Sequence, residues 1–173
     1  MPNSKGADAP RPTAIFLDCE ADGLLDSATC IHVVCVYDGL STLEFYSATQ
    51  LRNYLCSLRD LRVIVGHNII QYDYPLLSKL WGVELDPYKL RDTMIMSQLL
   101  HVKMEGGHSQ EAWAERLGMK KAGASINDFS KLTPELLERC RSDVQINARI
   151  YEVLYKKLNR KEFERALDVE HRL

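Results

Sequence analysis

Two carboxylates, Asp18 and Glu20, stand at the end of a short apolar run, residues 14–17. Because side chains on a strand alternate between its faces, a strand through this segment places both acids on one face. Two carboxylates about 4 Å apart repel by roughly 4 kcal/mol at an effective dielectric constant of about 20. A divalent cation between them removes that repulsion. The alternative is a strand that runs out into a polar loop, since Asp22 and Gly23 follow at once.

Two more acids occupy positions that suit a shared site. Asp73 stands near the start of an expected helix, shortly after a buried strand that ends at Gly66, and ligand sites in open α/β sheets cluster at strand ends. Its alternative role is to complement the positive end of that helix. Asp143 lies in the middle of a long expected helix, between apolar residues, and its alternative is a solvated acid paired with Arg139. Function is favoured by the set, because all four acids can converge on one sheet edge.

The segments that must position these acids alternate between strand and helix patterns. The expected strands are residues 13–18, 29–37, 42–46 and 61–65. The first three should form an antiparallel meander, because Asp38-Gly39 is a hairpin signal between the second and the third. The expected helices are residues 47–58, one that begins near Tyr72, 94–100, 110–117, 133–158 and 163–173. This order predicts an α/β domain with a mixed sheet and flanking helices.

Length and composition narrow the class of protein. The chain has 173 residues, 46% of them hydrophobic and 27% charged, which suits one globular domain. Its net charge of −2 argues against a protein that coats nucleic acid, but not against a nuclease with an acidic site. The five cysteines are odd in number and form no CxxC pair, which indicates reduced thiols in a cytosolic protein. No apolar run approaches about 18 residues, so we expect no membrane span. Residues 1–12 contain three prolines and read as a flexible leader.

The acids lie within motifs that resemble a known family. DCExDGLL from Asp18, HNxxxYDYPLL from His67 and RSD ending at Asp143 resemble the three exonuclease motifs of the DnaQ-like (DEDD) 3′–5′ exonucleases. The closest likeness is to the proofreading domain of bacteriophage family A DNA polymerases. Two further segments, RDTMIMSQLL and GGHSQEAWAERLG, are similar to linking segments of that domain. The resemblance implies a ribonuclease H-like fold, with residues 13–160 as the exonuclease domain. It also implies that residues 161–173 begin the helix that opens the polymerase portion.

The resemblance also implies a mechanism. Asp18, Glu20, Asp73 and Asp143 would hold two Mg²⁺ or Mn²⁺ ions, one activating the attacking water and the other stabilising the departing 3′ oxygen. Hard oxygen ligands without histidine or cysteine suit Mg²⁺. The substrate would be single-stranded or frayed DNA 3′ ends, and the products nucleoside 5′-monophosphates. A DNA polymerase chain or domain is the expected protein partner, and the cytoplasm, of the host cell if the protein is phage-encoded, the expected location.

Three further residues fall at substrate positions of the family. Leu24 matches an apolar wedge against the terminal base, and Asn68 and Tyr72 match positions near the substrate. Packing in the core is the alternative for Leu24 and Tyr72.

The third motif departs from the family pattern. One branch has a tyrosine four residues before the last acid, and the other has a histidine five residues before it. This chain has Arg139 and Glu138 at those positions. Three interpretations follow. Arg139 would pair with Asp143 and compete with one metal, or it would contact the scissile phosphate. In the third interpretation, Glu138 would help to position the attacking water. Two rivals to a DNA exonuclease therefore stay open: a weakened or inactive module that binds nucleic acid or a polymerase, and an exoribonuclease of the same fold.

Overall fold

The structure is a computed structural model that describes residues 13–123, 125–158, 166, 169 and 170. The expected leader, residues 1–12, lies outside the described residues. So does most of the expected C-terminal helix, residues 163–173.

A five-stranded mixed sheet with the order β3-β2-β1-β4-β5 forms the centre of the fold. Its strands are β1 (Ala14–Ala21), β2 (Ile31–Tyr37), β3 (Thr42–Phe45), β4 (Val63–Gly66) and β5 (Leu90–Asp92). The first three strands pair antiparallel, as expected for a meander. β4 pairs parallel with β1, and β5 pairs parallel with β4. The sequence therefore predicted the mixed sheet correctly, but it did not predict the short edge strand β5.

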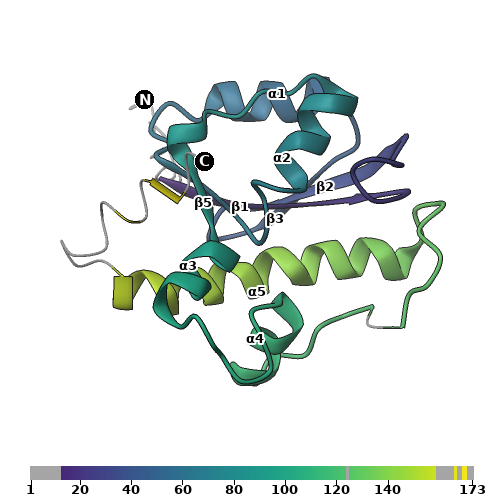
Figure 1. The fold of residues 1–173 in the computed structure, drawn as a ribbon. Coiled ribbons are helices and arrows are strands. Elements are labelled where there is room, and N and C mark those ends of the chain that lie inside the picture. The colour runs from purple at the N-terminus through teal and green to yellow at the C-terminus, as the bar shows by residue number, and fades with distance from the viewer. Residues whose placement is uncertain (1–12, 124, 159–165, 167–168, 171–173) are drawn as a thin grey trace, which may run out of the picture.

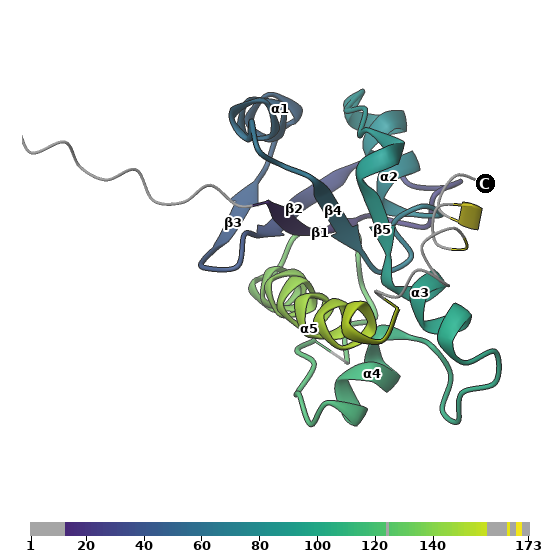
Figure 2. The same ribbon diagram turned by 90° about the vertical axis from the view of Figure 1, so that its left-hand side faces the viewer.

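Helices cover both faces of this sheet (Figures 1 and 2). On one face lie α1 (Ala48–Ser57) and α2 (Asp73–Leu76), which continues into a π-helical turn, Leu77–Trp81. On the other face lie α3 (Thr93–Leu100), α4 (Gln110–Arg116) and the long α5 (Pro134–Leu158). Four of these helices begin after a residue whose side chain accepts a hydrogen bond from a backbone N–H group of the first turn. This bond satisfies one of the N–H groups that have no partner within the helix. These capping residues are Ser47, Asp92, Ser109 and Thr133.

The first strand is longer than predicted. β1 runs through Asp18 and Glu20 to Ala21, because β2 pairs with it opposite both acids. The acids therefore lie within a strand and not at its mouth. β2 begins at Ile31, two residues later than predicted, where the preceding chain is held by the Asp22 side chain.

The apolar stripe of α5 packs against the sheet as its spacing predicted. Cys140 and Val144 are fully buried against Val33 and Cys35 of β2. Asp143 lies on this buried side of the helix, so the packing of α5 fixes the position of one acid relative to the sheet. No helix among the described residues is long and apolar enough to cross a membrane.

Candidate metal centre and active site

The candidate site forms where β1 extends beyond its neighbour β4. β4 pairs with β1 only as far as Phe16 and ends at Gly66. Past that point one edge of β1 has no strand beside it, so its backbone groups need other partners. The Cys19 N–H on this edge donates to Asp73 Oδ1 over 3.0 Å. The open edge of β1 thus holds the first residue of α2 beside the acids of the strand.

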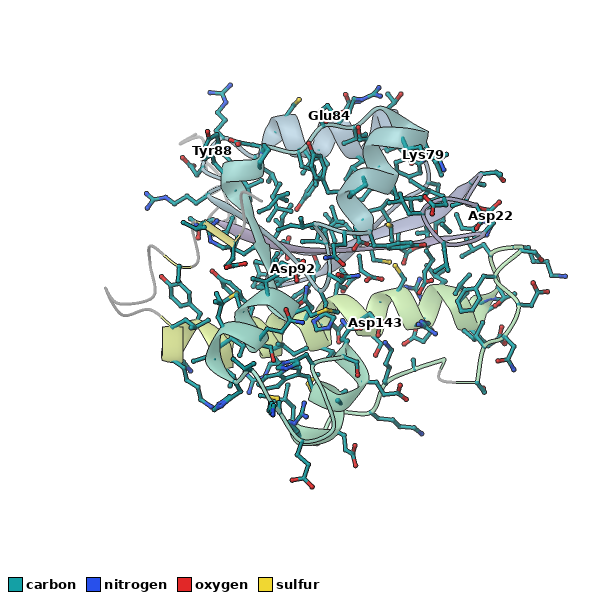
Figure 3. All side chains as sticks on the ribbon, viewed as in Figure 1. Asp22, Lys79, Glu84, Tyr88, Asp92 and Asp143 are labelled. Carbon is teal, nitrogen blue, oxygen red and sulfur yellow. The ribbon has the colours of Figure 1, made fainter. Side chains whose placement is uncertain are left out.

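Three carboxylates converge on this edge. Asp18, Glu20 and Asp143 each offer one oxygen, and these oxygens all lie within 4.8 Å of one another. Figure 3 labels Asp143 on α5, close to the sheet. Asp143 Oδ1 is buried and has no hydrogen-bond partner among the described residues. A buried carboxylate oxygen without a donor is costly, and an all-oxygen donor set fits a hard divalent cation. These three residues therefore fit a divalent metal ion.

Asp73 is not part of that group of three. Its Oδ1 accepts hydrogen bonds from both the N–H and the thiol of Cys19. It lines the same cavity as the other acids, a space of about 680 Å³. Asp73 thus shares the cavity, with one of its two oxygens engaged by β1.

Two cations face the acids. Arg139 Nε lies 3.3 Å from Glu20 Oε1 and 3.7 Å from Asp143 Oδ2. Lys121 Nζ lies 3.1 Å from Asp143 Oδ2 and donates to Gln110 Oε1 over 3.0 Å. The Gln110 amide also donates to the Asp143 carbonyl over 2.8 Å. The positive charges offset part of the repulsion among the acids.

The Arg139 side chain is held on its other side by the segment before α5. Its guanidinium lies over the Phe129 ring, 5.5 Å from the ring centre. Gly123, which has a φ of +64°, approaches so closely that a Cβ there would lie 2.9 Å from Arg139 Cβ. Glu138 instead pairs with Arg141 and is largely exposed. Of the three interpretations of the third motif, the one that uses Glu138 gains no support from this geometry.

Burial raises the pKa of every acid in the cluster. The pKa of Glu20 rises to about 7 because of burial, against the opposing charge of Arg139. Burial raises the pKa of Asp73 to about 6, although the hydrogen bonds from Cys19 work against it. The pKa of Asp18 rises through burial and the nearby Asp73 charge, and that of Asp143 rises through burial despite Lys121. Without a metal, Glu20, with a pKa of about 7, is therefore partly protonated near neutral pH.

The three predicted substrate residues line the same cavity. Leu24 is 77% exposed, so the core-packing alternative for it is wrong. The Tyr72 hydroxyl donates to the Gly23 carbonyl over 2.8 Å. Asn68 has a φ of +64°, and its N–H donates to Asp92 Oδ1 over 2.9 Å. The structure thus gathers around one cavity all the residues that the motifs singled out, apart from Glu138.

Comparison with known proteins identifies relatives by sequence. No family model matches the chain. The chain is 32% identical over 150 residues to the DNA-directed DNA polymerase of Escherichia phage T7, and 30% identical over 146 residues to that of Enterobacteria phage T3. These matches cover 70% and 68% of the chain and 21% of each polymerase, so the chain spans about a fifth of the length of these relatives.

Solved structures of other proteins share the fold of this chain. Brucella melitensis NrnC superposes with a TM-score of 0.74 at 22% identity, covering 93% of this chain and 81% of NrnC. Escherichia coli RNase D superposes with a TM-score of 0.71 at 19% identity, covering 93% of this chain and 44% of RNase D. The chain is homologous to the phage polymerases and has the DnaQ-like exonuclease fold. The predicted resemblance and the ribonuclease H-like fold are therefore confirmed.

Among the cavity residues of this DnaQ-like fold that sequence reasoning missed, three contact Asp143 or Arg139: Gln110, Lys121 and Phe129. They come from α4 and from the segment between α4 and α5. The only sequence signal was Lys121 beside another lysine in a polar stretch, which is typical of a solvated loop. Their role depends on how that segment folds back over α5, which no local pattern indicates.

Proposed function

We propose that this DnaQ-like chain is a divalent-metal-dependent 3′–5′ exonuclease that hydrolyses DNA at single-stranded or frayed 3′ ends, as in proofreading, and releases nucleoside 5′-monophosphates. The observation that carries the proposal is the meeting of Asp18, Glu20 and Asp143 within 4.8 Å at the open edge of β1, with Asp73 in the same cavity. Homology to DNA polymerases favours DNA over RNA as the substrate.

The four acids are the proposed ligands of two Mg²⁺ or Mn²⁺ ions. Bound ions would supply the Lewis acidity that activates the attacking water and stabilises the leaving 3′ oxygen. The unpartnered Asp143 Oδ1 supports a cation at this position, and the related fold of NrnC has been solved with bound Mg²⁺. Leu24, Asn68 and Tyr72 are the proposed contacts to the terminal nucleotide, because they line the same cavity.

We propose that Arg139 alters the nuclease activity of this site without abolishing that activity. Its guanidinium reaches Glu20 and Asp143 through Nε, and a guanidinium is well suited to phosphate oxygens. We expect it to neutralise part of the cluster in the free protein and to face the scissile phosphate when substrate is bound. All four acids remain, so we expect altered activity rather than none.

An exoribonuclease is the second candidate, favoured by the structural neighbours. RNase D is an exoribonuclease, and NrnC has been solved bound to pGG. A weakened module is the third, favoured by the two cations that already pair with the acids. Since the relatives are much longer polymerases, we also propose that residues 13–160 form the nuclease domain and that residues 161–173 lead towards a polymerase domain or chain. The same phage homology supports the host cytoplasm as its location.

A nuclease assay with matched oligomers tests the proposal. Wild type, Asp18→Asn and a control, Asp60→Asn, are incubated with 3′-labelled and 5′-labelled single-stranded DNA and RNA of one sequence, with Mg²⁺ or Mn²⁺. Asp60 is an exposed acid outside the cavity. We expect stepwise shortening from the 3′ end of DNA, a loss of about 10³-fold in Asp18→Asn, and normal rates in the control.

The three candidates give different results. Faster degradation of RNA than of DNA would show that RNA is the preferred substrate, and the proposed 3′–5′ exonuclease reaction would stand. Equal background cleavage by wild type and Asp18→Asn would rule out the proposed nuclease activity. In that case, calorimetry without detectable Mn²⁺ binding, with a mononucleotide present, would favour the inactive module.

A further inference from the structure

The loop formed by residues 22–28 follows the acidic strand and carries Leu24 at the rim of the cavity. Lys79 holds this loop from outside the site. Its ammonium donates to the carbonyl of Leu25 over 2.6 Å, of Asp26 over 3.3 Å and of Ala28 over 3.4 Å. An ammonium group has three donors and no acceptor, so this one lysine uses all its donors on one loop.

The beginning of the loop is tied down independently. The Tyr72 hydroxyl donates to the Gly23 carbonyl over 2.8 Å. The Asp22 carboxylate accepts from the N–H groups of Thr29 and Cys30 over 2.8 and 3.0 Å, which closes the loop at its base. Figure 3 labels Asp22 and Lys79 at the same end of the molecule.

The Leu24 carbonyl is satisfied within the loop. Leu24 O accepts from the N–H groups of Ser27 and Ala28 over 2.9 and 2.7 Å. A loop whose carbonyls are paired in this way has lost most of its conformational freedom. It nevertheless keeps the Leu24 side chain 77% exposed beside the acids.

The element that carries Lys79 is itself braced. Lys79 lies in the π-helical turn Leu77–Trp81, a rare geometry that occurs often at functional sites. Arg52 of α1 donates to the last carbonyl of this turn over 2.5 Å, and the Ser78 hydroxyl donates to Glu84 over 2.5 Å. The ammonium therefore projects from a fixed base towards the loop.

We propose that Lys79 is a positioning residue that fixes the loop of residues 22–28, so that Leu24 is held ready to enter between the terminal base and its paired partner. Lys79 does not touch the reacting atoms and acts through Leu24. Holding the loop in place before substrate arrives lowers the cost of binding a paired end. Lys79 therefore sets how well paired 3′ ends are degraded relative to single strands, and this inference rests on the proposed exonuclease function.

The test compares a single-stranded oligomer with a blunt duplex that ends in the same 3′ sequence. Lys79→Met keeps the length of the side chain but removes its donors, and Lys79→Arg keeps a cation with donors. Lys103→Met is the control for an exposed lysine outside the cavity. We expect Lys79→Met to lower the duplex to single-strand ratio of kcat/KM by roughly threefold to tenfold, the net range for one ordinary hydrogen bond. Lys79→Arg should recover most of the ratio.

Two further measurements separate positioning from a general loss of stability. Hydrogen exchange without substrate should be faster at the Ser27 and Ala28 amides of Lys79→Met. In the Leu24→Ala background, Lys79→Met should change the ratio little, because both changes act on the same step.

An equal fall on both substrates, an unchanged ratio, or a full additional effect in Leu24→Ala would overturn the role of Lys79 while leaving the nuclease in place. A wild-type protein without any nuclease activity would overturn the proposed function and this inference together.

Discussion

Glu20 makes the stability of the metal-free protein depend on pH in an unusual direction. Its pKa rises from the ordinary value of 4.5 to about 7 in the folded protein, mainly through burial. The folded state therefore binds more protons than the unfolded state between those two values, and its stability falls as the pH rises through that window. Most surface carboxylates that gain a partner on folding behave in the opposite way.

The size of the effect follows from the two pKa values. A single carboxyl with these values lowers the free energy of unfolding by about 2 kcal/mol between about pH 5.5 and about pH 8. Glu20 is only 8% exposed, so solvent screening removes little of this effect. For a chain of this size, about 2 kcal/mol corresponds to a fall in Tm of roughly 4–8 °C. The raised pKa values of Asp18, Asp73 and Asp143 act in the same direction.

Urea denaturation in EDTA at about pH 5.5 and about pH 8 measures how the free energy of unfolding changes with pH. Glu20→Gln is the test variant, and Glu115→Gln, at an exposed position, is its matched control. We expect wild type and Glu115→Gln to lose stability towards pH 8, and Glu20→Gln to lose distinctly less. Mn²⁺ should remove the loss in wild type, because a cation favours the ionised acids. Stability that is flat or that rises with pH in EDTA would refute the assignment of Glu20 to a buried, repelling cluster.

Two substitutions test other parts of the site. Arg139→Tyr removes the cation whose Nε lies 3.3 Å from Glu20 Oε1. We therefore expect calorimetry to show at least about tenfold tighter Mn²⁺ binding. An unchanged Mn²⁺ affinity would contradict the role of Arg139 as a counterion of the acids. Gly66→Ala would place a Cβ 2.4 Å from the Ile69 Cβ where β4 ends. We expect the free energy of unfolding to fall by about 1–3 kcal/mol in urea, and a stability within about 0.5 kcal/mol of wild type would mean that this turn has room.

The placement of three of the acids follows from local patterns, although only the set of four favoured a shared site. Asp18 and Glu20 end an apolar run, and Asp143 is placed by the apolar spacing of a helix that begins at Thr133-Pro134. The limits of β1 were not predictable, because an acid-cysteine-acid segment reads as a loop until β2 pairs with it. β5 was missed because three residues, Leu90–Asp92, are too few to show a period.

The contacts of charged side chains between distant segments were the part that the sequence could not predict. Lys121 has the local appearance of a solvated lysine, and only the path of the chain between α4 and α5 brings it 3.1 Å from Asp143. Lys79 likewise reads as a polar position on a helix, although three carbonyls of a distant loop receive its donors. Such contacts depend on tertiary structure between segments far apart in sequence, where patterns of apolar residues carry no information.

Arg139 and Lys121 together explain how this cluster can fold before any metal binds. The four acids repel one another and resist ionisation, as their raised pKa values indicate. A tyrosine at position 139 would add no charge, whereas an arginine contributes a permanent cation that reaches two of the acids. The same cation would repel an incoming divalent ion, so we expect the gain in metal-free stability to come at the expense of metal affinity. We therefore propose that the departure in the third motif shifts that balance, which the response of metal binding to Arg139→Tyr measures directly.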